Sequence, residues 1–188
     1  MSESSNFLCS QKNPSNVGKW DAFYQSRPES LTYGNTISYV KAAEFFSDIE
    51  TVEDWGCGGG GFRQFWTKNY VGVDGSRSNF ADVKADLATY PSEVEAIFMR
   101  HVLEHNVLWK FILSNAVASF RKKFCLVLFT PFVDQTQEIA YYPGLDVPDI
   151  AFAIDDITSH FSGLTWRAEQ YIVPESQYNT ETLFYISR

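Results

Sequence analysis

The chain has 188 residues, of which 45% are hydrophobic and 16% aromatic, and this indicates a single globular domain with one sizeable core. Its net charge of −8 argues against a nucleic-acid partner, because proteins that track a phosphate backbone carry a basic stripe. No stretch is apolar for long enough to cross a membrane, and the first residues lack the features of a secretory signal. We therefore expect a cytoplasmic protein without a membrane partner.

The cysteines are consistent with that compartment. Cys9 lies in a polar leader, Cys57 in a glycine run and Cys125 in an apolar run. Neither a metal-binding spacing nor a disulfide framework emerges from these positions. Three free thiols are typical of the reducing cytosol.

The first part of the chain is polar. Residues 1–18 are rich in Ser and Asn, which indicates a flexible leader before a single domain over residues 19–188. Aromatic residues between Trp20 and Tyr24 predict a short helix. From Thr36 to Phe46 apolar residues recur at helical spacing and predict an amphipathic helix.

Strands and helices then alternate. The predicted strands are Thr51–Trp55, Tyr70–Val73, Asp82–Ala85, Glu95–Met99, Phe124–Thr130, Trp166–Val173 and Thr182–Ser187, and the predicted helices are Phe62–Thr67, Val102–Phe120 and Asp155–Phe161. The stretch from Gly75 to Ala81 is too short for a crossover helix, and residues Pro131 to Asp149 are predicted to form a loop. The last two strands alternate as an antiparallel pair does. This order predicts an α/β three-layer sandwich on a mostly parallel sheet.

A glycine loop follows the first predicted strand, in the run T-V-E-D-W-G-C-G-G-G-G-F that ends at Phe62. Glycines at 56, 58 and 60 let the backbone turn tightly and approach a ligand. Gly56, Gly58 and Gly61 also fit the G-x-G-x-x-G pattern of dinucleotide-binding proteins. The glycines alone therefore leave an NAD-dependent oxidoreductase open.

Two acids flank this loop. Asp54, two positions before it, would repel a pyrophosphate by on the order of 1–4 kcal/mol. The same carboxylate attracts the ammonium and sulfonium groups of S-adenosylmethionine. Asp74, at the end of the next strand, suits the ribose hydroxyls of either cofactor.

This arrangement resembles motif I and the following acidic motif of class I S-adenosylmethionine-dependent methyltransferases of the small stand-alone type, and the resemblance runs from about Lys19 to the end. It implies a Rossmann-like sandwich whose seven-stranded sheet includes an antiparallel strand from the terminal hairpin. It also implies S-adenosylmethionine as the cofactor, held by Asp54, Gly56, Cys57, Gly58, Gly60, Asp74, Gly75, Asp86, Leu87, Met99 and Arg100.

The resemblance gives several of these residues a role. The glycine loop passes under the methionine part of the cofactor, and Asp86 with the Leu87 amide binds the adenine. Backbone carbonyls of Met99 and Arg100 accept hydrogen bonds from the amine of the cofactor's methionine part. For Asp86 the alternative role is to cap a turn.

The segment after the fourth strand contains Leu103-Glu104-His105, and many small class I methyltransferases carry a similar L-E-H. Three interpretations are open. Glu104 can stabilise the start of a helix while His105 packs on the glycine-loop helix. His101 can act as a general base next to the transferred methyl, which is the role we assign to it. His101, Glu104 and His105, on one helical face, could instead hold a divalent metal, but we assign no metal.

The acceptor is bounded by what the sequence lacks. No [D/N/S]-P-P-[Y/F] and no Pro-Cys follow the fourth strand, which excludes two routes to methylated bases. We expect transfer to an O or N atom of a small molecule or a saccharide. Six aromatic residues could cover the acceptor site, pack in the core or form a homodimer interface. They are Trp20, Tyr24, Tyr33, Phe132, Tyr141 and Tyr142. The alternative from another class is a cofactor-binding module without catalysis that acts through a partner.

Overall fold

The computed structural model describes residues 14–27, 29, 32, 34–174 and 176–188. Most of the predicted leader, Cys9 and Tyr33 therefore lie outside the described residues. The main sheet has seven strands in the order β3 (Val83–Lys84), β2 (Asn69–Asp74), β1 (Thr51–Trp55), β4 (Val94–Arg100), β5 (Phe120–Leu128), β9 (Thr180–Ser187) and β8 (Thr165–Ile172). The first five are parallel, and β9 is antiparallel to both of its neighbours. The predicted fold class is confirmed.

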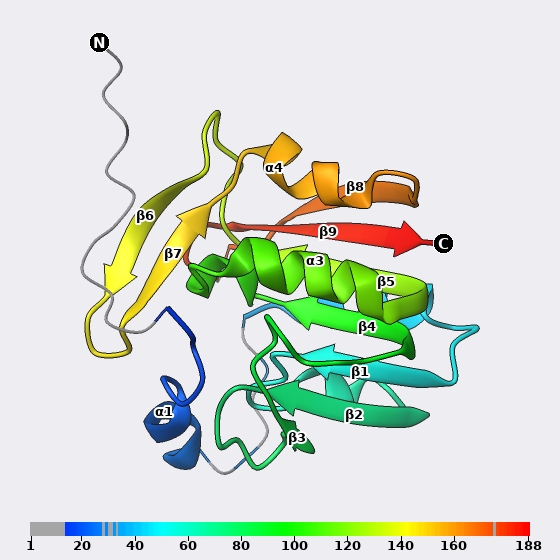
Figure 1. Ribbon diagram of the computed structural model, residues 1–188, viewed down its shortest axis with the longest axis horizontal. Helices are drawn as coiled ribbons and strands as arrows, with labels where there is room; N and C mark the ends of the chain where they lie inside the picture. Colours follow the sequence, from blue (N-terminus) through cyan, green and yellow to red (C-terminus); the bar gives the residue numbers. More distant parts are fainter. Residues whose placement is uncertain (1–13, 28, 30–31, 33, 175) are drawn as a thin grey trace.

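Helices cover both faces of this sheet. The helix α3 (Trp109–Ser119) lies on the face toward the viewer in Figure 1, and α2 (Ile37–Phe45) packs on the other. Because side chains alternate along a strand, Trp55 packs toward α3 while Val52 packs toward α2. A strand buried on both faces needs a continuous apolar run, which is the pattern from which Phe124–Thr130 was predicted.

The predicted helix Val102–Phe120 is wrong in its first third and at its last residue. A single 3-10 turn, Leu103–His105, is followed by irregular backbone before α3, and Phe120 already belongs to β5. The break begins at His101, whose φ of 57° is left-handed, and the Asn106 side chain donates to the Val102 carbonyl at 2.6 Å. His101, Glu104 and His105 therefore do not share a helical face.

The helix predicted over Phe62–Thr67 is also wrong. Only a 3-10 turn, Phe62–Gln64, follows the glycine loop. The chain turns back at once toward β2, where the Trp66 indole N–H donates to the Asn69 carbonyl at 3.0 Å. A full helix N-terminus thus does not face the ligand site, and His105 cannot pack on such a helix.

The loop predicted from Pro131 to Asp149 contains a hairpin instead. Strands β6 (Gln137–Tyr142) and β7 (Val147–Ala151) form a second, two-stranded sheet. The prolines at 143 and 148 hid this pattern, because proline within a run argues against a strand. The hairpin and α1 (Asp21–Gln25) lie at the left of Figure 1, toward which the arrows of β1, β2 and β4 point.

The last helix is confirmed as α4 (Ile154–Thr158) with the 3-10 turn Ser159–Phe161. No helix among the described ranges is long and apolar enough to cross a membrane.

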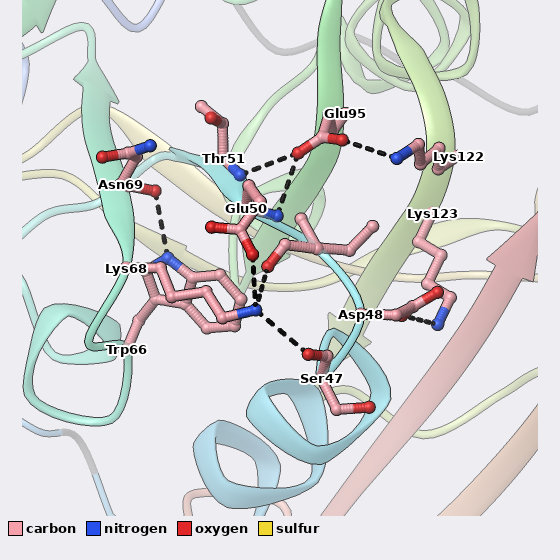
Figure 2. A network of polar contacts seen from close by, with 11 residues as sticks. Ser47, Asp48, Glu50, Thr51, Trp66, Lys68, Asn69, Glu95, Lys122 and Lys123 are labelled. Atoms are coloured by element: carbon pink, nitrogen blue, oxygen red, sulfur yellow. Dashed lines mark hydrogen bonds and ion pairs between the residues drawn. The ribbon is translucent and has the colours of Figure 1, made fainter.

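The amino ends of the strands are held by a network of charged side chains (Figure 2). Glu95 Oε2 accepts the backbone N–H groups of Glu50 and Thr51, both at 2.9 Å, and Oε1 accepts Lys122 Nζ at 2.6 Å. Lys68 Nζ donates to the carbonyl oxygens of Ser47 and Ile49. These bonds connect the turn after α2 with β1, β4 and β5.

Candidate active site

A cavity of about 530 Å³ lies at the carboxyl ends of the strands. Its walls come from the glycine loop, the end of β2, the segment after β4, the residue after β5 and the start of β9. Residues of α1 and of the β6–β7 hairpin close it from outside the sheet. Ligands of open α/β sheets bind at this end of the strands.

The glycine loop requires glycine at the positions that carry its turn. Gly56, Gly58 and Gly60 have φ values of 76°, 48° and 70°. A Cβ on Gly56 would lie 2.2 Å from Val102 Cγ2, and one on Gly58 would lie 2.4 Å from the Tyr24 hydroxyl. The loop is therefore kept narrow by its neighbours as well as by its backbone.

Of these loop residues, Gly56, Cys57 and Gly58 line the cavity, as does Gly61. Gly60 does not line it, and its missing side chain makes room for the ring of Phe80. Cys57 is buried, and burial raises the pKa of its thiol above the usual range. It is therefore a packed thiol and not a nucleophile.

Asp54 lies at the cavity and is 3% exposed. It accepts the hydroxyl of Tyr70 at 2.6 Å. Burial raises its pKa to about 7, opposed by the Tyr70 hydrogen bond and reinforced by the charge of Asp74. A cation placed beside Asp54 would return this carboxyl to its ionised form.

Asp74 ends β2 and also lines the cavity. One of its oxygens accepts the Gly58 N–H at 2.8 Å, and the other accepts both the N–H and the hydroxyl of Ser76. Burial raises its pKa although these three donors lower it. A carboxylate has about four acceptor positions, so one stays open and the Ser76 hydroxyl can rotate to free another.

Asp86 and Leu87 line the same end of the cavity, together with Gly75. Asp86 Oδ1 accepts the Ala88 N–H at 3.0 Å, so it does cap a turn. Its Oδ2 accepts the hydroxyl of Ser15 at 2.8 Å. The end of the predicted leader is thus bound to the domain, and Asn16 and Val17 line the cavity too.

Met99 and Arg100 differ in position. Met99 is fully buried in the core under α3 and does not line the cavity. Arg100 does line it, and its guanidinium donates to the Ser38 hydroxyl, the Tyr39 hydroxyl and Glu181 Oε1 at 2.9, 2.9 and 2.6 Å. Arg100 is 8% exposed and Glu181 is fully buried, so this is a buried ion pair.

His101 shares the same acceptor. Its Nε2 lies 2.9 Å from Glu181 Oε1. Burial lowers the pKa of His101 to about 4, and the charge of Arg100 adds to that effect. Burial alone would raise the pKa of Glu181, but His101 and Arg100 outweigh it and keep the carboxyl ionised.

His105 forms a second pair with a carboxylate. Its Nδ1 lies 3.1 Å from the Pro148 carbonyl oxygen, toward which the hydrogen bond is directed, and 3.0 Å from Asp149 Oδ1. Burial lowers the pKa of His105, but Asp149 and Glu104 outweigh it and leave the pKa raised. The other Asp149 oxygen accepts the hydroxyls of Tyr142 and Tyr178.

Glu104 is a buried structural acid. Its Oε1 accepts the Phe129 N–H at 2.6 Å, its Oε2 has no partner among the described residues, and burial raises its pKa to about 7. His101, Glu104 and His105 thus bind three different partners. No group of three His, Cys, Asp or Glu side chains in the described part of the chain is placed to hold a metal ion.

No protein-family model matches the sequence, and a comparison with curated proteins finds no match. Solved structures do match. The 1,6-didemethyltoxoflavin-N1-methyltransferase of Burkholderia thailandensis, with 1,6-didemethyltoxoflavin and S-adenosylhomocysteine bound, is 13% identical at a TM-score of 0.60, over 82% of this chain and 79% of that one. The magnesium protoporphyrin IX methyltransferase of Synechocystis PCC 6803, with S-adenosylmethionine bound, is 14% identical at a TM-score of 0.60, over 89% of this chain and 90% of that one. An S-adenosylmethionine-dependent methyltransferase from Clostridium acetobutylicum ATCC 824 is 9% identical at a TM-score of 0.57, over 89% of this chain and 95% of that one.

The fold is that of class I S-adenosylmethionine-dependent methyltransferases. Within this methyltransferase fold the cavity has an acidic half and an aromatic half. The acidic half contains the glycine loop with Asp54, Asp74 and Asp86. The aromatic half contains the two histidines, His101 and His105, and the rings that pack on them, Trp20 and Phe129.

The aromatic half holds some of the residues predicted for an acceptor site. Trp20, Tyr24 and Tyr142 line the cavity, whereas Phe132 packs against Phe184 in the core. Tyr141 donates to Asp146 and does not line the cavity. Sequence reasoning missed Glu181, which stands 80 positions from His101 and shows no local signal beyond its place at the start of a strand.

Proposed function

We propose that this protein is an S-adenosylmethionine-dependent methyltransferase that acts on an O or N atom of a small molecule or a saccharide. One observation supports it most. Two buried carboxylates, Asp54 and Asp74, stand beside a loop of left-handed glycines in a single cavity. Asp54 would be unfavourable next to a pyrophosphate, which argues against NAD, whereas Asp74 suits the ribose of either cofactor.

The acidic half has the chemistry that the cofactor needs. Asp54, with one described donor and a raised pKa, gains a counter-charge from a cationic methionine end. Asp74 keeps an acceptor position for a ribose hydroxyl. We assign Asp86 and the Leu87 backbone to the adenine, which their position in the cavity lining supports, and the Arg100 backbone to the amine. Met99 does not line the cavity, so its assignment to the amine has no such support.

Little is required of the side chains during the transfer. S-adenosylmethionine supplies an electrophilic methyl group, so positioning the acceptor in line accounts for most of the acceleration. Trp20, Tyr24 and Tyr142 line the cavity and offer flat surfaces to a ring. His101 is neutral near pH 7 and is the side chain that we assign as proton acceptor.

Two relatives in fold act on ring systems, didemethyltoxoflavin and magnesium protoporphyrin IX. The aromatic lining suits a flat acceptor of that general kind, and it suits the face of a sugar equally. A binding module without catalysis remains the second candidate. It is favoured by one observation only, the low pKa of His101, which makes this imidazole a weak base.

The first experiment is calorimetric titration with S-adenosylmethionine, S-adenosylhomocysteine and NAD. We expect micromolar binding of the two methionine cofactors, no binding of NAD, and loss of binding in Asp74→Ala. A protein that binds NAD, or none of the three, would contradict the proposal. A folded protein that binds the cofactors but methylates no member of a broad panel of phenols, amines and sugars would favour the binding module.

A further inference from the structure

His101 has an unusual backbone and a specific partner. Its φ of 57° is left-handed, which is unfavourable for a residue with a side chain. The backbone N–H of His101 donates to the Val127 carbonyl at 3.0 Å, which holds this conformation against β5. Strain of this kind at the edge of a cavity points to a side chain whose position matters.

The contact with Glu181 determines where the proton of His101 lies. A carboxylate oxygen only accepts hydrogen bonds, and Glu181 is ionised because Arg100 donates to the same oxygen at 2.6 Å. At 2.9 Å from that oxygen, Nε2 must therefore carry the proton. Since the ring is neutral, Nδ1 has a lone pair, and no residue that the structure describes donates to it.

The second histidine provides a contrast. His105 uses Nδ1, not Nε2, toward the Pro148 carbonyl and Asp149, and no arginine among the described residues forms an ion pair with Asp149. Its pKa is raised where that of His101 is lowered. The two rings thus differ in the nitrogen that donates to the protein and in the direction in which their pKa values are shifted.

We propose that Glu181 fixes the proton of His101 on Nε2, so that Nδ1 takes the proton that the acceptor loses as it is methylated. This rests on the proposed function. Glu181 is a positioning residue, because it acts through His101. The inference also defines the acceptor as a molecule that presents an O–H or N–H group in the aromatic half.

The step balances without a further reactant. A bond forms between the acceptor atom and the methyl carbon of S-adenosylmethionine. The bond between that carbon and the sulfonium sulfur breaks, and its electron pair stays on sulfur. The acceptor proton moves to Nδ1, and the imidazolium formed is stabilised by Glu181. A weak base suffices, because an O–H or N–H group becomes strongly acidic as its atom gains the methyl.

The tautomer can be measured without knowing the acceptor. The chain has three histidines, so ¹⁵N-histidine labelling with long-range ¹H–¹⁵N spectra gives three rings, assigned with His101→Gln and His160→Gln. With S-adenosylhomocysteine bound, we expect His101 to be neutral with Nε2–H from pH 5.5 to 8. The charged and titratable groups that face it are Arg100, Glu181 and His105. A proton on Nδ1, or a cationic ring near pH 7, would overturn the inference.

A second arm examines Nδ1 itself. Phenol is used as a small flat O–H donor and anisole as its control without the hydroxyl. We expect phenol to shift the Nδ1 resonance of His101 and anisole to leave it unchanged. No shift with phenol near its solubility limit, or an equal shift with anisole, would overturn the assignment of Nδ1 as proton acceptor.

The variants Glu181→Gln and Glu93→Gln complete the test. Glu93 is an exposed acid outside the cavity, so its variant should leave the His101 spectrum unchanged. In Glu181→Gln we expect the Nε2 proton to exchange faster, because its charged acceptor is gone; an unchanged exchange rate would overturn the role of Glu181. Should that variant not fold, the wild-type tautomer still decides. Calorimetry with S-adenosylhomocysteine tests the proposed function separately, so a cofactor-binding protein with the wrong tautomer loses only this inference.

Discussion

At the amino ends of the strands, the carboxylate of Glu95 is surrounded by donors, whereas at the carboxyl ends Asp54 is buried with a single described donor. Figure 2 shows the first of these, where Glu95 lies between Thr51 and Lys122. The Lys122 ion pair and the two backbone N–H groups lower the pKa of Glu95 to about 2. Burial raises the pKa of Asp54 to about 7.

The difference shows how one sheet can serve two purposes. At the amino ends each charge is neutralised within the protein, and the network joins neighbouring strands. At the carboxyl ends Asp54 and Asp74 form no ion pair with the described residues, so a cationic ligand bound beside them would stabilise the protein. Removal of a charge should therefore weaken cofactor binding at the carboxyl ends of the strands and lower stability at the amino ends.

The largest effect is expected at Asp74. Asp74→Asn removes the charge and one acceptor oxygen from the position assigned to the ribose. We expect S-adenosylhomocysteine to bind roughly 100-fold more weakly in calorimetry, since a hydrogen bond to a charged group contributes about 1.5–3 kcal/mol.

The matched control for this variant is Asp82→Asn. Asp82 accepts the Gly72 N–H at 2.8 Å, close to the same loop, but it does not line the cavity. Its substitution should leave the affinity for the cofactor unchanged. Equal losses in the two variants would mean that loop stability, and not contact with the ribose, explains the effect.

The next largest effect is expected for the loop backbone. Gly56→Ala introduces a Cβ at a φ of 76° and 2.2 Å from Val102 Cγ2. We expect it to lower the free energy of unfolding by about 2 kcal/mol or more, measured by urea denaturation. Gly144→Ala is the control, because a Cβ there meets no atom within 4 Å, and its stability should stay within about 0.5 kcal/mol of the wild type. A Gly56→Ala protein as stable as the Gly144→Ala protein would show that the loop is not confined.

The charge of Asp54 should make cofactor binding depend on pH. The pKa of Asp54 is about 7 in the folded protein, above its ordinary value of 3.8. The stability that protonated Asp54 contributes to the protein without cofactor is therefore complete below about pH 4 and is lost as the pH rises through 7. A cationic cofactor favours the ionised form, so its affinity should fall by up to about tenfold per pH unit below 7. Asp54→Asn should remove that slope. If the dissociation constant of S-adenosylmethionine for the wild type does not change between pH 6 and pH 8, Asp54 is not the counter-charge of the cofactor.

The smallest effect is expected at the amino ends. Glu95 has a folded pKa of about 2 against 4.5 in the unfolded chain, so its stabilisation is present above 4.5 and is lost as pH falls through 2. Glu95→Gln should lower the melting temperature modestly at pH 7 and not at pH 2, with cofactor affinity unchanged. A loss of affinity in this variant would show that the two ends of the sheet are coupled.

Much of the fold could be predicted from the sequence. Phe124–Thr130 is a continuous apolar run, the last two strands alternate, and the glycine loop with Asp54 and Asp74 is a local pattern. Elements whose form depends on distant contacts were mispredicted. The helix from Val102 was shortened by the left-handed backbone of His101, and the β6–β7 hairpin was hidden by its prolines.

By itself the sequence determined the acidic half of the cavity, because its acids and glycines lie at or just after the ends of three neighbouring strands, β1, β2 and β3. Only the tertiary structure decided the aromatic half. Insertion of β9 beside β5 brings Glu181 to Arg100 and His101, and the β6–β7 hairpin brings Asp149 to His105. These pairs lie 44 to 81 positions apart, and no local spacing encodes them, because the packing of strands and hairpin sets which side chains meet.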